Sequence, residues 1–321
     1  MNVDPIPFRD RSYDLGGVIG QALTIRSANP INHHQAVTDP QGCGPIDLDA
    51  QLFVPSGAAA PPATVILVPG SLGVGPNHEQ HAATLIRAGF AVCLLDPFGA
   101  RSVASTVAEQ TQYSFAASAF DVLATLRQLA ERDDLDPMRI GAQGHSRGGS
   151  AVTIAAHRRF ADPIIGSDLA LAGVFAVYPW CGQQFEDADV RATTYRAIIG
   201  DQDEWCSVQQ VQAQVHALRQ RGAAATIRIV AGAAHSFDRL EEPYTIEEAS
   251  VAPAAPTVML ADDGAMILPT VGTPDPAVTD RDAFVDAIEA GHGRQGAAIG
   301  GVGDQPAIFE ADMLAFHRSW S

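Results

Sequence analysis

Gly144-His145-Ser146-Arg147-Gly148-Gly149 is the stretch that decides the fold of this chain. The spacing G-x-S-x-G is typical of a strained strand-to-helix turn, where a side chain at either flanking glycine would collide with a neighbouring strand or helix. Asp136-Pro137 marks a turn, Met138–Gln143 suits a buried strand, and Ser150–Ala156 is a small-residue segment typical of a helix packed closely on a sheet. Ser146 is therefore the candidate nucleophile. The alternative is a glycine-rich loop with a solvated serine.

Short apolar runs that alternate with helix-length segments extend this pattern along the chain. Thr64–Val68 and Ala91–Leu95 are typical of strands buried on both faces, and the helix-length segment His81–Gly89 lies between them. The alternation continues through helices near 113–132 and 207–221 and the strands Leu171–Val177, Tyr195–Ile199 and Thr226–Val230. We therefore predict an α/β fold with a mostly parallel, doubly wound sheet covered on both faces.

The two ends of the chain have a different composition. Residues 1–62 are rich in Pro, Gly and Asn, and only Gln51–Pro55 resembles a strand, which we expect at an antiparallel edge. Residues 241–305 are rich in Pro, Gly and Ala, and Thr257–Leu260 and Ala265–Leu268 flank an Asp-Gly pair typical of a β-hairpin. The predicted organisation is an N-terminal extension with edge strand over 1–62, a core over 63–240, an insertion that could act as a lid over 241–305, and a C-terminal helix of the core over 306–321.

Composition and charge restrict the partners. The 321 residues are 46% hydrophobic, enough for one catalytic domain with additions. The net charge of −17, with only 20 Lys and Arg, argues against an electrostatic grip on phosphates, which excludes nucleic acid as a partner and disfavours anionic membranes. The expected partner is a small-molecule substrate, and a homodimer is the assembly to test.

Cysteine usage and the absence of targeting signals bear on the compartment. Cys43, Cys93, Cys181 and Cys206 are scattered without C-x-x-C pairing, so we expect reduced thiols. No apolar run reaches the roughly 18 residues of a membrane span, and Met1–Pro7 lacks a basic, then apolar, leader pattern. We therefore expect a cytoplasmic protein that does not engage a membrane.

A serine nucleophile requires a general base and an acid that orients it, in the order Ser, Asp or Glu, His for this arrangement. His235 follows the strand Thr226–Val230 and lies on a loop at the carboxyl end of that strand, where catalytic groups gather. His157 and His216 fall within helices, where we expect surface or packing roles. The loop Gly200-Asp201-Gln202-Asp203-Glu204 supplies the candidate acid, and sequence order alone cannot choose among its carboxylates. We favour Asp203, with Asp201 as the alternative.

An oxyanion formed at the ester carbonyl requires two preorganised N–H donors. One is expected to be the amide of Arg147, directly after the nucleophile. For the other we favour the amide of Ser71, with Leu72 as the alternative, in the glycine-rich loop after Thr64–Val68. The side chain of Arg147 could bind a substrate carboxylate, although an ion pair with a neighbouring carboxylate is the more frequent role. Four aromatic residues follow strands and, with Leu72, are candidates to wall an acyl pocket: Phe98, Tyr178, Trp180 and Trp205.

Two further motifs partly resemble metal-binding and nucleotide-binding patterns. His78-Glu79-Gln80-His81 is one residue shorter than the zinc motif H-E-x-x-H. Gly70–Gly75 is rich in glycine but lacks both the G-x-G-x-x-G spacing and a Walker lysine. We therefore predict neither a metal nor a cofactor.

Five ordered motifs together resemble the dienelactone hydrolase family of α/β-hydrolases. The resemblance covers about residues 50–240 and, with the closing helix, about two thirds of the chain. In that family the acid is the aspartate of G-x-x-D, which corresponds to Asp203, and the base is the histidine of G-x-x-H-x-F, which corresponds to His235. The motifs are Val68–Gly73, Asp96–Arg101, Gly144–Gly149, Gly200–Asp203 and Ala231–Asp238.

The resemblance implies a serine hydrolase that cleaves a carboxylic ester or lactone through an acyl-enzyme intermediate. Dienelactone hydrolases proper use a cysteine nucleophile, whereas this chain carries Ser146, so the dienelactone substrate does not transfer. The chain is also longer than the minimal family domain, and we expect the additions to shape substrate choice. The alternatives are an acyltransferase or peptidase with the same triad, or a catalytically silent ligand-binding protein.

Overall fold

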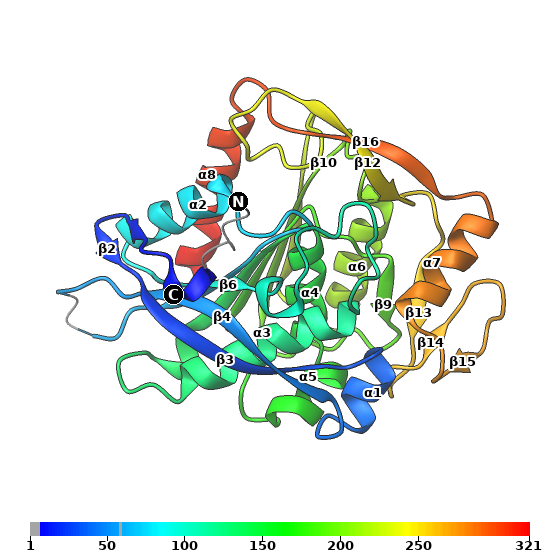
Figure 1. Cartoon of the computed structure of the whole chain (residues 1–321), viewed down its shortest axis with the longest axis horizontal. Helices are drawn as coiled ribbons and strands as arrows, with labels where there is room; N and C mark the ends of the chain where they lie inside the picture. The colour runs from blue at the N-terminus through cyan, green and yellow to red at the C-terminus, as the bar shows by residue number, and fades with distance from the viewer. Residues whose placement is uncertain (1–6, 58–59) are drawn as a thin grey trace, which may run out of the picture.

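A central eight-stranded sheet organises the molecule (Figure 1). The computed structural model describes residues 7–57 and 60–321, so positions 1–6 and 58–59 of the predicted N-terminal extension lie outside the described residues. In spatial order the strands are β11 (Ala225–Val230), β10 (Thr194–Gly200), β8 (Gly173–Val177), β7 (Ile140–His145), β5 (Thr64–Val68), β6 (Ala91–Asp96), β4 (Gly44–Phe53) and β3 (Gln21–Asn29).

The strands from β11 to β6 are parallel, and β4 and β3 add an antiparallel edge. The strands of the parallel part are mostly buried, except for β11 at the outer edge. The predicted α/β-hydrolase fold with an antiparallel N-terminal edge is confirmed.

Helices cover both faces of the sheet, as the alternation of side chains along β7 shows. On one face Gly141 is packed so closely against Trp320 that a Cβ would lie 2.5 Å from the indole. On the other face a Cβ at Gly144 would lie 2.0 Å from the carbonyl oxygen of Gly148. The first face therefore carries α8 (Gln305–Trp320), which contacts α2 (Pro76–Arg87), and the second carries α4 (Arg147–Ala156), which packs on α3 (Phe115–Ala130). A further helix, α6 (Val208–Gln220), packs against β11 and β10.

The N-terminal edge is larger than its sequence predicts. β4 begins at Gly44 rather than Gln51, and its partner β3 pairs with it from Gln21 opposite Leu52 to Asn29 opposite Gly44. The sequence gives no clear strand pattern for β3, because only one side of the strand is covered and its exposed positions carry polar residues. Smaller elements missing from the sequence reading are β1 (Asp14–Leu15), β2 (Val18–Ile19), α1 (His33–Thr38) and α5 (Arg158–Ile165).

The insertion before α8 is structured. β12 (Tyr244–Val251) pairs with β16 (Arg294–Ile299), and β13 (Val258–Leu260) forms the predicted hairpin with β14 (Met266–Ile267). β13 also pairs in parallel with β9 (Gln183–Phe185), and β14 pairs with β15 (Pro274–Asp275). α7 (Asp280–Glu289) begins at a capping box formed by Thr279 and Asp282. Figure 1 places α7 and this small sheet together at one end of the molecule.

Two smaller findings concern membranes and thiols. Over residues 7–57 and 60–321, no helix is both long enough and apolar enough to cross a bilayer. Cys43, Cys93, Cys181 and Cys206 are free thiols, and all are buried.

Candidate active site

Ser146 occupies a strained turn between β7 and α4. Its φ of 52° and ψ of −113° are unusual for a residue with a side chain. The turn holds because the Ser146 N–H donates to the carbonyl of Val177 (2.9 Å) and its carbonyl accepts from the N–H of Ser150 (3.0 Å). A Cβ at Gly144 would meet the carbonyl of Gly148, and a Cβ at Gly148 would lie 2.5 Å from the carbonyl oxygens of Val68 and Pro69, so neither glycine has room for a side chain. The hydroxyl of Ser146 therefore lies at the carboxyl edge of the sheet, as G-x-S-x-G predicts.

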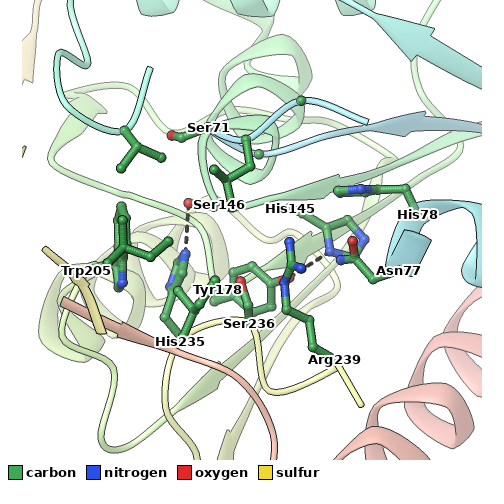
Figure 2. Close-up of a pocket in the computed structure, with 16 residues that line it drawn as sticks. Ser71, Asn77, His78, His145, Ser146, Tyr178, Trp205, His235, Ser236 and Arg239 are labelled. Atoms are coloured by element: carbon green, nitrogen blue, oxygen red, sulfur yellow. Dashed lines mark hydrogen bonds between the residues drawn. The ribbon is translucent and has the colours of Figure 1, made fainter. Parts of the chain in front are cut away.

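The structure brings Ser146, His235 and Asp203 into one hydrogen-bonded chain. His235 Nε2 lies 3.0 Å from Ser146 Oγ (Figure 2). Its Nδ1 lies 2.7 Å from Asp203 Oδ2. The loops bearing the base and the acid touch at Gly200, where a Cβ would lie 2.0 Å from the carbonyl oxygen of Ala233. Only glycine allows this approach, so Gly200 positions one loop against the other.

Of the two candidate aspartates, the geometry favours Asp203 as the acid. Its side chain is fully buried, and its Oδ1 accepts the backbone N–H groups of Trp205 and Cys206, both at 2.8 Å. Asp201 lies exposed on the turn and accepts the N–H of Gly232 at 2.7 Å. Asp203 therefore faces the imidazole, whereas the exposed Asp201 links its own loop to the loop that bears His235 through Gly232.

Two aromatic rings hold the imidazole of His235. The indole of Trp205 is stacked on it, with centroids 5.3 Å apart and planes 20° from parallel, and the ring of Tyr178 packs at 4.5 Å (Figure 2). The indole N–H of Trp205 donates to the carbonyl of Ala298 in β16, and the N–H of Gly300 donates to the carbonyl of His235, both at 2.9 Å. The insertion thus contacts the base directly.

The predicted oxyanion donors lie beside the nucleophile. Arg147 is the first residue of α4, so its N–H is one of the free donors at a helix N-terminus. A Cβ at Gly70 would lie 3.2 Å from the Cβ of Ser146, which places the loop bearing Ser71 and Leu72 against the elbow. The hydroxyl of Ser71 donates to Gln110 (3.0 Å), which leaves its amide as the group available to a substrate.

The expected ion pair of Arg147 with a carboxylate is wrong. Its buried guanidinium donates to the carbonyls of Gln110 (2.7 Å), Tyr113 (2.6 Å) and Ser114 (3.2 Å), and it lies about equally close to the rings of Tyr113 (4.2 Å) and Phe115 (4.1 Å). The carbonyls of the 110–114 segment point toward the turn at Ser146. No pattern in the sequence indicates this orientation. The fork of Arg147 is occupied by backbone, so it organises the wall of the site.

Two cavities meet at Ser146. The outer cavity, about 30 Å³, is lined by Ser71, Ser146, His235 and Arg239 among others, and the inner cavity, about 40 Å³, by Ser146, Arg147, Phe115 and Phe284 among others. Of the predicted pocket residues, Leu72 and Tyr178 line the outer cavity, Trp180 lines the inner one, and Trp205 lines both.

Phe98 has a different place from the other pocket candidates. It packs behind the loop, with its ring 5.8 Å from that of Tyr113 and close to Gly73. The signal for Phe98 was its position after a strand, which does not say which way the side chain turns.

Cys206 lies next to the nucleophile, where its thiol interacts with the Ser146 hydroxyl. Burial, together with the charge of Asp203, raises the pKa of the Cys206 thiol well above its usual value. The sulfur therefore stays protonated, and a protonated thiol is a poor nucleophile.

A buried polar network behind the site was missed by the sequence reading. Asp238 accepts the Tyr178 hydroxyl proton at Oδ1 (2.7 Å) and the side chains of His81 (2.7 Å) and Asn77 (3.0 Å) at Oδ2. Burial acts to raise the pKa of Asp238, but the hydrogen bond from His81 and neighbouring charges hold it well below its usual range. The only sequence clues were the position of Asp238 three residues after His235 and the paired histidines His78 and His81.

The network continues from Tyr178 through the sheet to α8. His145 Nδ1 lies 2.9 Å from the Tyr178 hydroxyl, and its Nε2 lies 3.0 Å from Nε2 of Gln143. The oxygen of Gln143 in turn lies 3.0 Å from Nε2 of His317. Burial lowers the pKa of His145 well below its usual value and that of His317 to about 3. Neutral rings with the proton on Nδ1 of His145 and on Nε2 of His317 satisfy the whole chain of bonds.

Two groups in the described part of the chain have metal-type side chains close together. His81, His145 and Asp238 offer ligand atoms within 4.8 Å of one another, as do Asp203, Cys206 and His235. In both groups the carboxylate is already hydrogen-bonded to an imidazole at 2.7 Å. These hydrogen bonds account for each arrangement through the chain's own residues.

Comparisons with known proteins show the family of this chain. The sequence model of the dienelactone hydrolase family matches residues 48–259. A solved structure titled m3DLH is similar, with 15% identity over 84% of this chain and 95% of that chain and a TM-score of 0.53, which supports the shared fold. A dienelactone hydrolase-like promiscuous phosphotriesterase from metagenomic libraries has 15% identity, coverage of 84% and 95%, and a TM-score of 0.49.

A dienelactone hydrolase from Anabaena variabilis has 17% identity over 67% of this chain and 88% of that chain, with a TM-score of 0.46. The search of curated proteins gives no match.

Proposed function

The chain belongs to the dienelactone hydrolase family and is a carboxylic ester hydrolase, and on that premise we propose that it cleaves a carboxylic ester or lactone through an acyl-enzyme formed at Ser146. One observation carries the proposal: the unbroken chain from Asp203 through His235 to Ser146, with contacts of 2.7 and 3.0 Å. The strained turn at Ser146 and the free N–H groups beside it support the same chemistry.

The proposed reaction needs no group beyond the chain and water. His235 Nε2 takes the hydroxyl proton as Ser146 Oγ bonds to the carbonyl carbon, and the amides of Arg147 and Ser71 stabilise the oxyanion. The acyl C–O bond then breaks, and His235 passes its proton to the leaving oxygen. Water adds to the acyl-enzyme with His235 again as base, and the proton returns to Ser146 as the acid leaves. Asp203 holds the proton on Nδ1 throughout.

A fluorophosphonate probe tests the nucleophile. We expect the probe to label the wild-type protein and not Ser146→Ala, and we expect the variant to lose turnover on its best ester by up to about 10⁶, because triad members act as a unit. Cys206→Ala is the matched control, since its protonated thiol is not expected to react. Melting temperatures show whether each variant is folded. More than a tenth of wild-type turnover in Ser146→Ala, or labelling that depends on Cys206, contradicts the proposal.

A further inference from the structure

A third cavity continues the inner cavity away from Ser146. This chamber, about 200 Å³, is enclosed by α7, the strands of the insertion and the end of α3. It shares four lining residues with the inner cavity: Phe115, Trp180, Ala252 and Phe284. One tract therefore leads from the nucleophile, past these residues, to the chamber beneath α7.

The positions of His235 and Arg147 assign a substrate group to each side of Ser146. The leaving oxygen must receive a proton from His235, so the alcohol part departs through the outer cavity, which His235 lines. The acyl part remains bonded to Ser146 and extends into the inner cavity, beside Arg147. The chamber then lies at the far end of the acyl group.

The size and lining of the chamber describe that acyl group. A dry cavity of about 150 Å³ admits benzene, so about 200 Å³ holds an aromatic ring or a chain of several carbons. Its walls are mainly apolar, with Val258, Ala283 and Ala287 beside the shared aromatic rings. The carboxylate of Asp280 also lines it and accepts the N–H of Phe115 (2.7 Å), which disfavours an anionic ligand.

Two buried amide oxygens of the chamber lining have no partner among the described residues, those of Gln183 and Gln210. The nitrogen of Gln183 donates to Asp280 (2.6 Å) and that of Gln210 to the carbonyl of Ala255 (3.0 Å). Turning either amide over would set its oxygen against another acceptor, so the orientations are fixed. Both oxygens have less than 1 Å² of accessible surface, so a hydroxyl or N–H in the chamber cannot reach them, and they do not interrupt its apolar wall.

We propose that the preferred substrate is an ester whose acyl group is uncharged and apolar, a medium-length chain or an aryl group, and ends in the chamber beneath α7. This inference rests on the proposed function and adds the substrate class.

The experiment measures how kcat/KM depends on the length of the acyl chain. Ethyl esters from acetate to decanoate are assayed by pH-stat, and kcat/KM is expected to rise roughly fourfold for each methylene that enters the chamber. Ala287→Phe fills the chamber, whereas Val285→Phe places the same ring on the solvent side of α7. We expect Ala287→Phe to lower the octanoate-to-acetate ratio at least tenfold and Val285→Phe to leave it unchanged.

The outcomes separate the two proposals. If acetate is hydrolysed through Ser146 but the acyl ratios ignore Ala287→Phe, the chamber assignment is wrong and the proposed function stands. If no ester is hydrolysed and Ser146→Ala equals the wild type, the proposed function itself fails.

Discussion

Asp203→Asn should disable the base by changing its tautomer. Oδ1 of Asp203 accepts two backbone N–H groups, of Trp205 and Cys206, each at 2.8 Å. An asparagine keeps both bonds only with its oxygen in that place, which turns its NH₂ toward Nδ1 of His235. Two donors then face each other unless the imidazole carries its proton on Nε2. That nitrogen lies 3.0 Å from Ser146 Oγ and could no longer accept the hydroxyl proton.

The opposite orientation of the amide is less favourable. It would set the NH₂ against two buried N–H groups and leave both without an acceptor, at a cost of about 1–3 kcal/mol each. The wrong tautomer should therefore dominate, and the charge that stabilises the imidazolium is also gone. We expect kcat to fall at least a hundredfold and by up to about 10⁴, equivalent to about 5 kcal/mol of transition-state stabilisation.

The measurement is kcat on a p-nitrophenyl ester, with melting temperatures as folding controls. Asp201→Asn is the matched control. In the structure the N–H of Gly232 donates to Asp201 Oδ1 at 2.7 Å, and an asparagine oxygen at that position can still accept this hydrogen bond. We expect it to lose less than tenfold. A larger catalytic loss in Asp201→Asn than in Asp203→Asn would refute the assignment of the acid and the alignment of the G-x-x-D motif behind it.

Three further predictions concern stability and access. Tyr178→Phe leaves Asp238 and His145 each short of a buried hydrogen bond, so urea unfolding should show a loss of about 2–4 kcal/mol, with kcat within tenfold because the ring still packs on His235; unchanged stability would count against the network. Burial lowers the pKa of His33 from 6.5 to about 4, so its contribution is complete above pH 6.5 and is lost as the pH falls toward 4; relative to His33→Phe, the wild type should lose about 2 kcal/mol between pH 7.5 and 5, and a constant difference would contradict this. If residues 241–305 act as a lid, a covalent inhibitor on Ser146 should slow limited proteolysis there, whereas equal cleavage rates with and without it would argue against a lid.

The motifs at strand ends could be placed from sequence because they depend on local rules. Ser146 needs its flanking glycines, and His235 and Asp203 follow apolar strands, so the order and spacing of the residues predict both their turns and their shared edge of the sheet. The same reasoning could not orient the side chain of Arg147 or Phe98, because those directions depend on a distant segment, residues 110–114.

Partners that are far apart in sequence account for most of what was missed. Asp238 contacts His81, 157 residues away, and Gln143 contacts His317, 174 residues away. Nothing local distinguishes these buried histidines from surface ones. β3 was missed for the opposite reason, because its exposed positions interrupt the apolar pattern that marks a strand.

If residues 241–305 act as a lid, their contacts limit which part of the segment could move. β16 lies against the base: Ala298 accepts the indole N–H of Trp205, and Gly300 donates to the carbonyl of His235. Lifting β16 would break both bonds and release the indole that is stacked on His235, so the enzyme would lose its base whenever it opened. α7 carries no such contact with the triad, yet it closes the chamber through Phe284 and Ala287. If the insertion acts as a lid, movement of α7 with β16 held in place would admit substrate and keep the catalytic groups aligned.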